Sequence, residues 1–93
     1  MSVFSSGFLP DFIATPLRAY VNEIIQFTDL STGDPTEWDW NFGDRSVHST
    51  EQNPVHSYAS PGYYTVTLRA GSGSTSSAIT KVNYIEVVYE ESG

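Results

Sequence analysis

The acidic and amide side chains between residues 39 and 44 are the first place in this sequence where metal chemistry is conceivable. Asp39, Asn41 and Asp44 carry oxygen atoms, the ligands that calcium prefers. An EF-hand loop, however, needs oxygen ligands at positions one, three and five, glycine at six and glutamate at twelve. Counted from Asp39, position five is Gly43 and position twelve is Thr50. The spacing therefore excludes an EF-hand.

The two histidines, His48 and His56, could act as metal ligands or as a catalytic base. Pro54 lies between them, and their spacing defines no shared geometry and brings in no third ligand. The chain has no cysteine, so a thiolate metal site is excluded. Serines are abundant, but no G-x-S-x-G turn presents one as a nucleophile, and no glycine-rich phosphate loop is present. These absences predict a protein that is not an enzyme.

The charge balance narrows the range of partners. The chain of 93 residues has 4 basic and 11 acidic residues, which gives a formal net charge of −7. Such a surface repels nucleic acids and anionic membranes. No run of about 18 apolar residues occurs, so we expect no membrane insertion, and residues 1–7 do not resemble a signal peptide. The length suits a single domain, which we expect to be monomeric when isolated.

The elements that would position these side chains are strands. Trp38, Trp40 and Phe42 alternate with polar residues, the two-residue period of a strand with one buried face. Similar short runs recur between Gly, Pro, Ser and Asp residues, and no window shows a helical stripe, so an all-β fold is predicted. Pro16 ends the first run, and residues 71–77 are expected to form a hairpin loop. The expected strands cover residues 8–14, 20–30, 36–42, 63–70 and 78–88.

The buried faces of these strands predict the core. Its expected members are Phe12, Val21, Ile25, Phe27, Trp40, Phe42, Tyr64, Val66, Leu68, Ile85 and Val87. Trp38 lies nearest the end of its strand, so we expect it to be partly exposed. Ile24 breaks the alternation of its own strand, and we place it beneath a loop or under a sheet edge.

Several tyrosines fall on the strand faces opposite the core. Exposed aromatic rings on a flat sheet can stack on sugar rings, but tyrosine is also an ordinary strand-forming residue. We favour the ordinary interpretation, since isolated exposed rings are normal on protein surfaces. The tyrosines considered are Tyr20, Tyr63, Tyr84 and Tyr89, several of which lie on the face opposite the core.

Several segments, in order and with ordinary spacing, resemble the PKD family of cell-surface and secreted domains. The match runs from about Leu9 to Val88. The residues that carry its main motifs are Trp38, Trp40, Phe42, Gly43, Asp44, Asn53, Pro54, His56, Tyr58, Gly62, Tyr64, Val66 and Leu68. The resemblance implies an immunoglobulin-like Greek-key β-sandwich of about seven strands in two antiparallel sheets. This domain would cover residues 8–89, with a flexible lead over 1–7 and a flexible tail over 90–93.

The turn after residue 42 departs from the family pattern at two positions. Asn41 stands where the family often has Asp, which keeps a side-chain acceptor. Arg45 stands where the family usually has Gly. If this turn keeps a positive φ, Arg45 carries a steric cost that glycine avoids. The alternative is a rebuilt loop.

The resemblance also implies roles for single residues. His56 is expected to make a structural hydrogen bond, and Tyr58 resembles a tyrosine corner, whose phenol bonds back to the backbone. Some secreted members of the family bind calcium with loop carboxylates, for which Asp11, Asp34 and Asp44 are the candidates here. A purely structural role for these three is favoured, and no other cofactor is expected.

Members of the family occur in microbial surface-layer-type proteins, secreted proteases and chitinases, and the polycystins. The resemblance therefore implies a non-catalytic extracellular or cell-surface module, which acts as a structural spacer and protein–protein interaction domain in a larger protein. Its expected partners are neighbouring domains of the same chain, together with cell-surface proteins or glycans. The alternative is a glycan- or polymer-binding accessory domain of a secreted hydrolase. Fold alone does not decide between these two functions.

Overall fold

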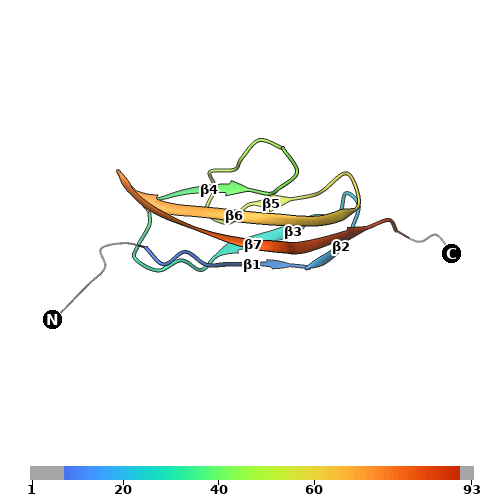
Figure 1. The fold of residues 1–93 in the computed structure, drawn as a ribbon, viewed down its shortest axis with the longest axis horizontal. Coiled ribbons are helices and arrows are strands. Elements are labelled where there is room, and N and C mark those ends of the chain that lie inside the picture. The colour runs from blue at the N-terminus through green and yellow to red at the C-terminus, as the bar shows by residue number, and fades with distance from the viewer. Residues whose placement is uncertain (1–7, 91–93) are drawn as a thin grey trace.

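The computed structural model describes residues 8–90, which form two β-sheets packed face to face (Figure 1). One sheet has the strand order β1-β3-β5 and the other β2-β7-β6-β4. The expected all-β sandwich of about seven strands is confirmed. The expected lead over 1–7 and most of the expected tail over 90–93 lie outside the described residues. The strands are β1 (Phe12–Thr15), β2 (Arg18–Tyr20), β3 (Ile25–Asp29), β4 (Glu37–Asn41), β5 (Val55–His56), β6 (Gly62–Ser72) and β7 (Thr75–Val88).

One strand pair departs from the expected antiparallel arrangement. β2 runs parallel to β7, whereas the other strand pairs within residues 8–90 are antiparallel. Pro16 has no N–H group to donate, so β1 ends here, as expected, together with its pairing to β3. The chain continues in the same direction into the second sheet as β2. There the Leu17 carbonyl accepts a hydrogen bond from the Glu86 N–H at 2.8 Å. Two purely antiparallel sheets were therefore a wrong expectation at this edge.

The single strand expected over residues 20–30 is divided by a turn. Asn22 has a φ of 69°, and the Glu23 N–H donates to the Tyr20 carbonyl at 3.0 Å. The Glu23 carboxylate also accepts the Tyr20 N–H at 2.8 Å, so this side chain occupies the outer edge of β2. Ile24 is 60% exposed in the same turn, which contradicts its expected place beneath a loop or edge.

The hairpin between β6 and β7 is tighter than the sequence suggests. The expected loop over residues 71–77 is a turn of Gly73 and Ser74 alone, because β6 continues to Ser72 and β7 begins at Thr75. Gly73 has a φ of 63°, which suits a two-residue hairpin turn. The two strands therefore run side by side along most of the molecule (Figure 1).

The core lies between the two sheets and is rich in aromatic rings. Of the expected members, Val21 and Tyr64 are only partly buried. Val21 lies in the turn after β2, and the Tyr64 hydroxyl donates to the Ser60 carbonyl at 2.6 Å near the surface. The other expected members are buried, and they are joined by four that the sequence analysis did not include. These four are Ala14, Ala19, Tyr58 and Ala70.

The outer edges of β1 and β4 are occupied by groups of the same chain. The Phe12 N–H bonds the Asp11 carboxylate at 2.8 Å, and the Phe12 carbonyl accepts the Lys81 ammonium at 2.6 Å. On β4, the backbone of Trp40 pairs with Ser49 through two hydrogen bonds of 2.8 and 3.1 Å. Unpaired edges invite strands of other molecules, and these contacts occupy part of each of the two edges.

The sandwich is elongated along the direction of β6 and β7 (Figure 1). The described chain begins near the β6–β7 turn, where Leu9 pairs with Thr32, and β7 ends at the far end of the long axis (Figure 1). We call these the N-proximal end and the C-proximal end. No helix within residues 8–90 has the length and apolar character needed to cross a membrane.

Candidate functional site

The two tryptophans of β4 point inward but differ in depth. Trp40 is fully buried, and its indole N–H donates to the Glu51 carbonyl at 2.9 Å. Trp38 is partly exposed, as expected, and its indole N–H donates to the Asp29 carboxylate at 3.0 Å. Both polar ends are satisfied by protein groups. The two rings therefore stabilise the fold and do not form an open aromatic platform.

The turn after β4 keeps a left-handed backbone. Gly43 has a φ of 84°, and a Cβ atom at this position would collide with the Thr65 carbonyl oxygen. Arg45 has a φ of 70°, so the turn has retained the conformation that glycine favours. The Asn41 side-chain oxygen accepts the Gly43 N–H at 3.0 Å. Asn41 thus provides the acceptor that we expected.

The next residue of this turn, Asp44, reaches His56 on β5. Its carboxylate lies 2.9 Å from the His56 Nε2 atom and also accepts hydrogen bonds from Ser46. Desolvation acts to raise the pKa of Asp44, but the hydrogen bonds from Ser46 and His56 outweigh it and hold the pKa below its ordinary value. The His56 ring stacks on Phe42 with centroids 4.0 Å apart. This contact matches the structural hydrogen bond expected for His56.

Tyr58 ties the same region to β4. Its buried hydroxyl donates to the Phe42 carbonyl at 2.8 Å, and its ring stacks on Tyr64 with centroids 4.1 Å apart. Desolvation raises the pKa of Tyr58 well above its ordinary value. The bond to the backbone is confirmed, but the acceptor lies 16 residues upstream instead of a few. The phenol therefore links the segment after β4 to the segment after β5, over a longer sequence separation than in a usual tyrosine corner.

Other motif residues fasten the long loop before β5 to β3. The Asn53 side-chain oxygen accepts the Asp29 N–H at 2.9 Å, and the Pro54 carbonyl accepts the Phe27 N–H at 2.9 Å. Gly62 begins β6. Farther along the same strand, Val66 and Leu68 are fully buried.

Asp29 joins several segments, although it was not among the expected site residues. Its carboxylate accepts hydrogen bonds from the Trp38 indole, the Gln52 amide and the Ser31 N–H, all at about 3.0 Å. The Asp-x-Ser spacing was a usable signal, because an aspartate often accepts a hydrogen bond from the backbone two residues later. Its contacts with Trp38 and Gln52 are long-range and have no such local signal.

The three calcium candidates are not brought together. Asp11 lies 3.1 Å from Lys81, whose hydrogen bond is the main cause that lowers the pKa of this aspartate. Asp44 is paired with His56, while Asp34 lies in the turn after β3 with a φ of 58°. Within residues 8–90, no three His, Cys, Asp or Glu side chains are grouped so that they could hold a metal ion.

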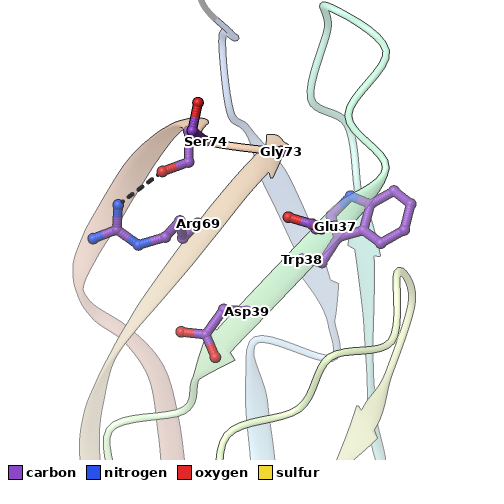
Figure 2. A pocket seen from close by; sticks show the side chains of 7 residues that line it. Glu37, Trp38, Asp39, Arg69, Gly73 and Ser74 are labelled. Carbon is purple, nitrogen blue, oxygen red and sulfur yellow. Dashed lines mark hydrogen bonds between the residues drawn. The ribbon is translucent and has the colours of Figure 1, made fainter.

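The outer face of the four-stranded sheet has a polar depression at the N-proximal end, shown in Figure 2, with a volume of about 230 Å³. Arg69 points from β6 towards the β7 side, where it donates to Ser76 at 3.2 Å. Glu37 and Asp39 line the β4 side, and His48 lies 3.1 Å from the Asp39 carboxylate. Arg69 and Asp39 are thus already engaged with neighbours, and no described hydrogen bond joins a serine of the depression to a histidine or a carboxylate.

The comparisons with known proteins agree with this architecture. The model of the PKD domain family matches residues 14–87. The chain belongs to the PKD domain family. A curated relative is collagenase ColA of Bacillus cereus, which is 42% identical over 73 residues. That match covers 72% of this chain but 8% of the collagenase, so the chain corresponds to a small part of its relative.

Two solved structures share the PKD fold seen here. One contains carbohydrate-binding modules of the β-sandwich superfamily. It matches with a TM-score of 0.80 and 23% identity, and the match covers 89% of the present chain and 35% of the chain in that structure. The other is the PKD1 domain of Vibrio anguillarum Epp. It matches with a TM-score of 0.70 and 22% identity, and the match covers 87% of the present chain and 95% of the chain in that structure. At these identities, the likeness concerns the fold.

Proposed function

We propose that this PKD domain is a non-catalytic spacer of an extracellular or cell-surface protein, which holds its neighbouring domains apart and contacts them. The observation that carries the proposal is the position of the two ends of the described chain. They lie at opposite ends of the elongated sandwich, so domains attached to them would be separated by its long axis (Figure 1).

A spacer must also be stiff, and the contacts between the sheets supply this property. β6 and β7 extend along most of the molecule, and the aromatic core fills the space between the sheets. Lys81 of β7 joins the Phe12 carbonyl of β1 at 2.6 Å and the Asp11 carboxylate at 3.1 Å. Close packing of this kind resists bending.

The geometry gives no support to catalysis by this chain. His48 and His56 are each paired with an aspartate, at 3.1 and 2.9 Å, and neither touches a serine or tyrosine hydroxyl in a described hydrogen bond. A catalytic base needs a nucleophile or substrate within hydrogen-bond reach.

The spacer role is tested by placing the chain between two copies of a well-folded globular protein and measuring the distance distribution by small-angle X-ray scattering. A Gly-Ser linker of 93 residues is the control, since such a flexible coil averages roughly 55 Å but fluctuates widely. We expect a narrow distribution for the PKD domain and a broad one for the linker. Equal widths would refute the spacer proposal.

A second candidate function is that of a polymer-binding accessory domain in a secreted hydrolase. The observation that favours it is the 42% identity to a segment of a collagenase. The test is cosedimentation of the chain with insoluble fibrillar collagen, chitin and cellulose. Saturable retention on one of these solids would support this function, and no retention on any would refute it.

A further inference from the structure

Three exposed tyrosines gather at the C-proximal end. Tyr20 and Tyr63 lie on the outer face of the four-stranded sheet, and Tyr89 follows the end of β7 beside Tyr20. Tyr20, Tyr63 and Tyr89 are 47, 64 and 71% exposed. Arg18 of β2 is paired with Glu86 of β7, which in turn is paired with Tyr63 of β6. We call Arg18, Tyr20, Tyr63, Glu86 and Tyr89 the tyrosine surface.

Strand alternation fixes the direction of these side chains. Ala19 and Val87 point into the core and are buried. Their neighbours Arg18, Tyr20 and Glu86 therefore point outward. This reading agrees with the side-chain contacts, because the Arg18 guanidinium lies 3.4 Å from the Glu86 carboxylate.

The tyrosine surface combines a polar row with a hollow. The Tyr63 hydroxyl lies 3.4 Å from the Glu86 carboxylate, so Arg18, Glu86 and Tyr63 form a continuous row across three strands. Beside this row, Arg18, Tyr20 and Tyr89 line a depression of about 260 Å³. Tyr20 and Tyr63 stand two strands apart, which separates their backbones by on the order of 10 Å. Several rings of one extended ligand can therefore contact the surface together.

The chemistry of the surface suits a sugar. Aromatic faces attract apolar C–H surfaces, and a pyranose ring presents such a surface between its hydroxyl groups. Arg18 can only donate hydrogen bonds and ionised Glu86 can only accept them, whereas a sugar hydroxyl does both. The two charges offset each other within a chain of net charge −7, so a neutral ligand is favoured over an anionic one.

We propose that the tyrosine surface binds a neutral polysaccharide, with the tyrosine rings stacked on sugar rings and the Arg18–Glu86 pair bonded to hydroxyl groups. This assignment rests on the polymer-binding role given above as the second candidate function. A proline-rich polypeptide would also stack on the rings. It has few free N–H donors, however, so it would donate few hydrogen bonds to the Glu86 carboxylate.

The experiment is affinity electrophoresis of the 93-residue chain through gels that contain hydroxyethyl cellulose, glucomannan or glycol chitin. We expect retardation in at least one of these gels. Tyr20→Ala and Tyr63→Ala should each weaken the affinity by about three- to tenfold, the range for a single aromatic contact. Arg18→Ala removes a hydrogen-bond donor and should weaken the affinity by a similar factor. Arg69→Ala is the matched control, because Arg69 lies on the same outer face at the other end of the sheet. Thermal melts of each variant would verify the fold.

The outcomes separate this proposal from the function on which it rests. Binding that Tyr20→Ala and Tyr63→Ala leave unchanged would refute the tyrosine surface but keep the polymer-binding function. Stronger retardation by carboxymethyl cellulose than by its neutral counterpart would refute the neutral ligand. Binding only to a triple-helical peptide of Gly-Pro-Hyp repeats would refute a polysaccharide ligand, and no retardation in any gel would also overturn the proposal.

Discussion

The molecule has two histidine–aspartate pairs of almost equal length that differ in their surroundings. His56 and Asp44 lie 2.9 Å apart, with side chains 17% and 19% exposed, and the histidine stacks on Phe42. His48 and Asp39 lie 3.1 Å apart on the outer face, 46% and 44% exposed. An exposed ion pair contributes little to stability, whereas removal of one partner from a largely buried pair leaves the other without compensation. We therefore expect the more buried His56–Asp44 pair to contribute more to stability than the exposed His48–Asp39 pair.

The same difference in burial distinguishes the polar residues of the PKD motifs from those of the outer face. Asp44, His56 and Tyr58, which we call the inner cluster, lie beside the core, where Asp44 bonds His56 and the Tyr58 hydroxyl bonds the Phe42 carbonyl. Within residues 8–90, no buried side-chain nitrogen or oxygen atom lacks a hydrogen-bond partner. The outer face, in contrast, has groups that remain open to solvent. We therefore expect stability to depend on the inner cluster, and any ligand to meet the outer face.

The largest effect on stability is expected at Trp40, whose ring packs against Phe42 beside the inner cluster. Its centroid lies 6.2 Å from that of Phe42, which in turn contacts His56. Trp40→Ala should lower the free energy of unfolding by about 3–5 kcal/mol, because the fully buried ring leaves a cavity. Urea denaturation measures this loss. A midpoint near that of the wild type would show that Trp40 is not part of the core.

The comparison between the two pairs is tested directly by His56→Ala and His48→Ala. The first should cost about 2–3 kcal/mol, since it removes a packed ring and the partner of one oxygen of the largely buried Asp44 carboxylate. The second should change stability by less than about 0.5 kcal/mol. Chemical denaturation of both variants under the same conditions gives the difference. Equal costs would mean that burial does not separate the two pairs.

Tyr58→Phe should have a smaller effect, about 1–2 kcal/mol. The substitution keeps the ring but removes the hydroxyl that donates a hydrogen bond to the buried Phe42 carbonyl at 2.8 Å. Tyr63→Phe is the control, because that hydroxyl is on the exposed outer face. The denaturant midpoint should fall for the first variant only, and an unchanged midpoint for both would remove the structural role of the Tyr58 hydroxyl.

The pH dependence of stability should also report on the buried pair. The pKa of Asp44 is lowered in the folded state, so its contribution is complete above the unfolded value of about 3.9 and is lost as the pH falls through the lower folded value. Asp44→Asn should therefore flatten the acid limb of a stability profile. Asp11 also has a lowered pKa, but it is more exposed, and Asp11→Asn should flatten the limb less. A larger flattening by Asp11→Asn than by Asp44→Asn would contradict the conclusion that the more buried pair contributes more to stability.

Local sequence patterns predicted the parts of this structure that depend on alternation and turn chemistry. The inward positions of Trp40, Val66 and Leu68 follow from a two-residue period, and the break at Pro16 follows from its missing N–H group. The division of residues 20–30 was missed, because Asn22 adopts a left-handed conformation that its residue type permits but does not require.

The contacts of the candidate sites were harder to predict than the strands. Tyr58 to Phe42 and Lys81 to Phe12 join residues that are far apart in sequence, and only the packing of the two sheets brings them together. The tyrosine surface is another case. Tyr20 and Tyr63 were recognised as exposed, but the parallel pairing of β2 with β7, which places them on one face, has no signal in the local sequence.

The smallest expected effect lies next to the buried pair, at Arg45. Its φ of 70° is left-handed, which costs a residue with a Cβ atom about 1–2 kcal/mol, while glycine loses about 0.5–1 kcal/mol more entropy on folding. Arg45→Gly should thus raise stability by roughly 0.5 kcal/mol, measured by the denaturant midpoint. Asp34→Gly is the matched control at a φ of 58°, where the gain should be smaller because aspartate tolerates this conformation better. A clear loss for Arg45→Gly alone would mean that the arginine side chain stabilises the turn that presents Asp44 to His56.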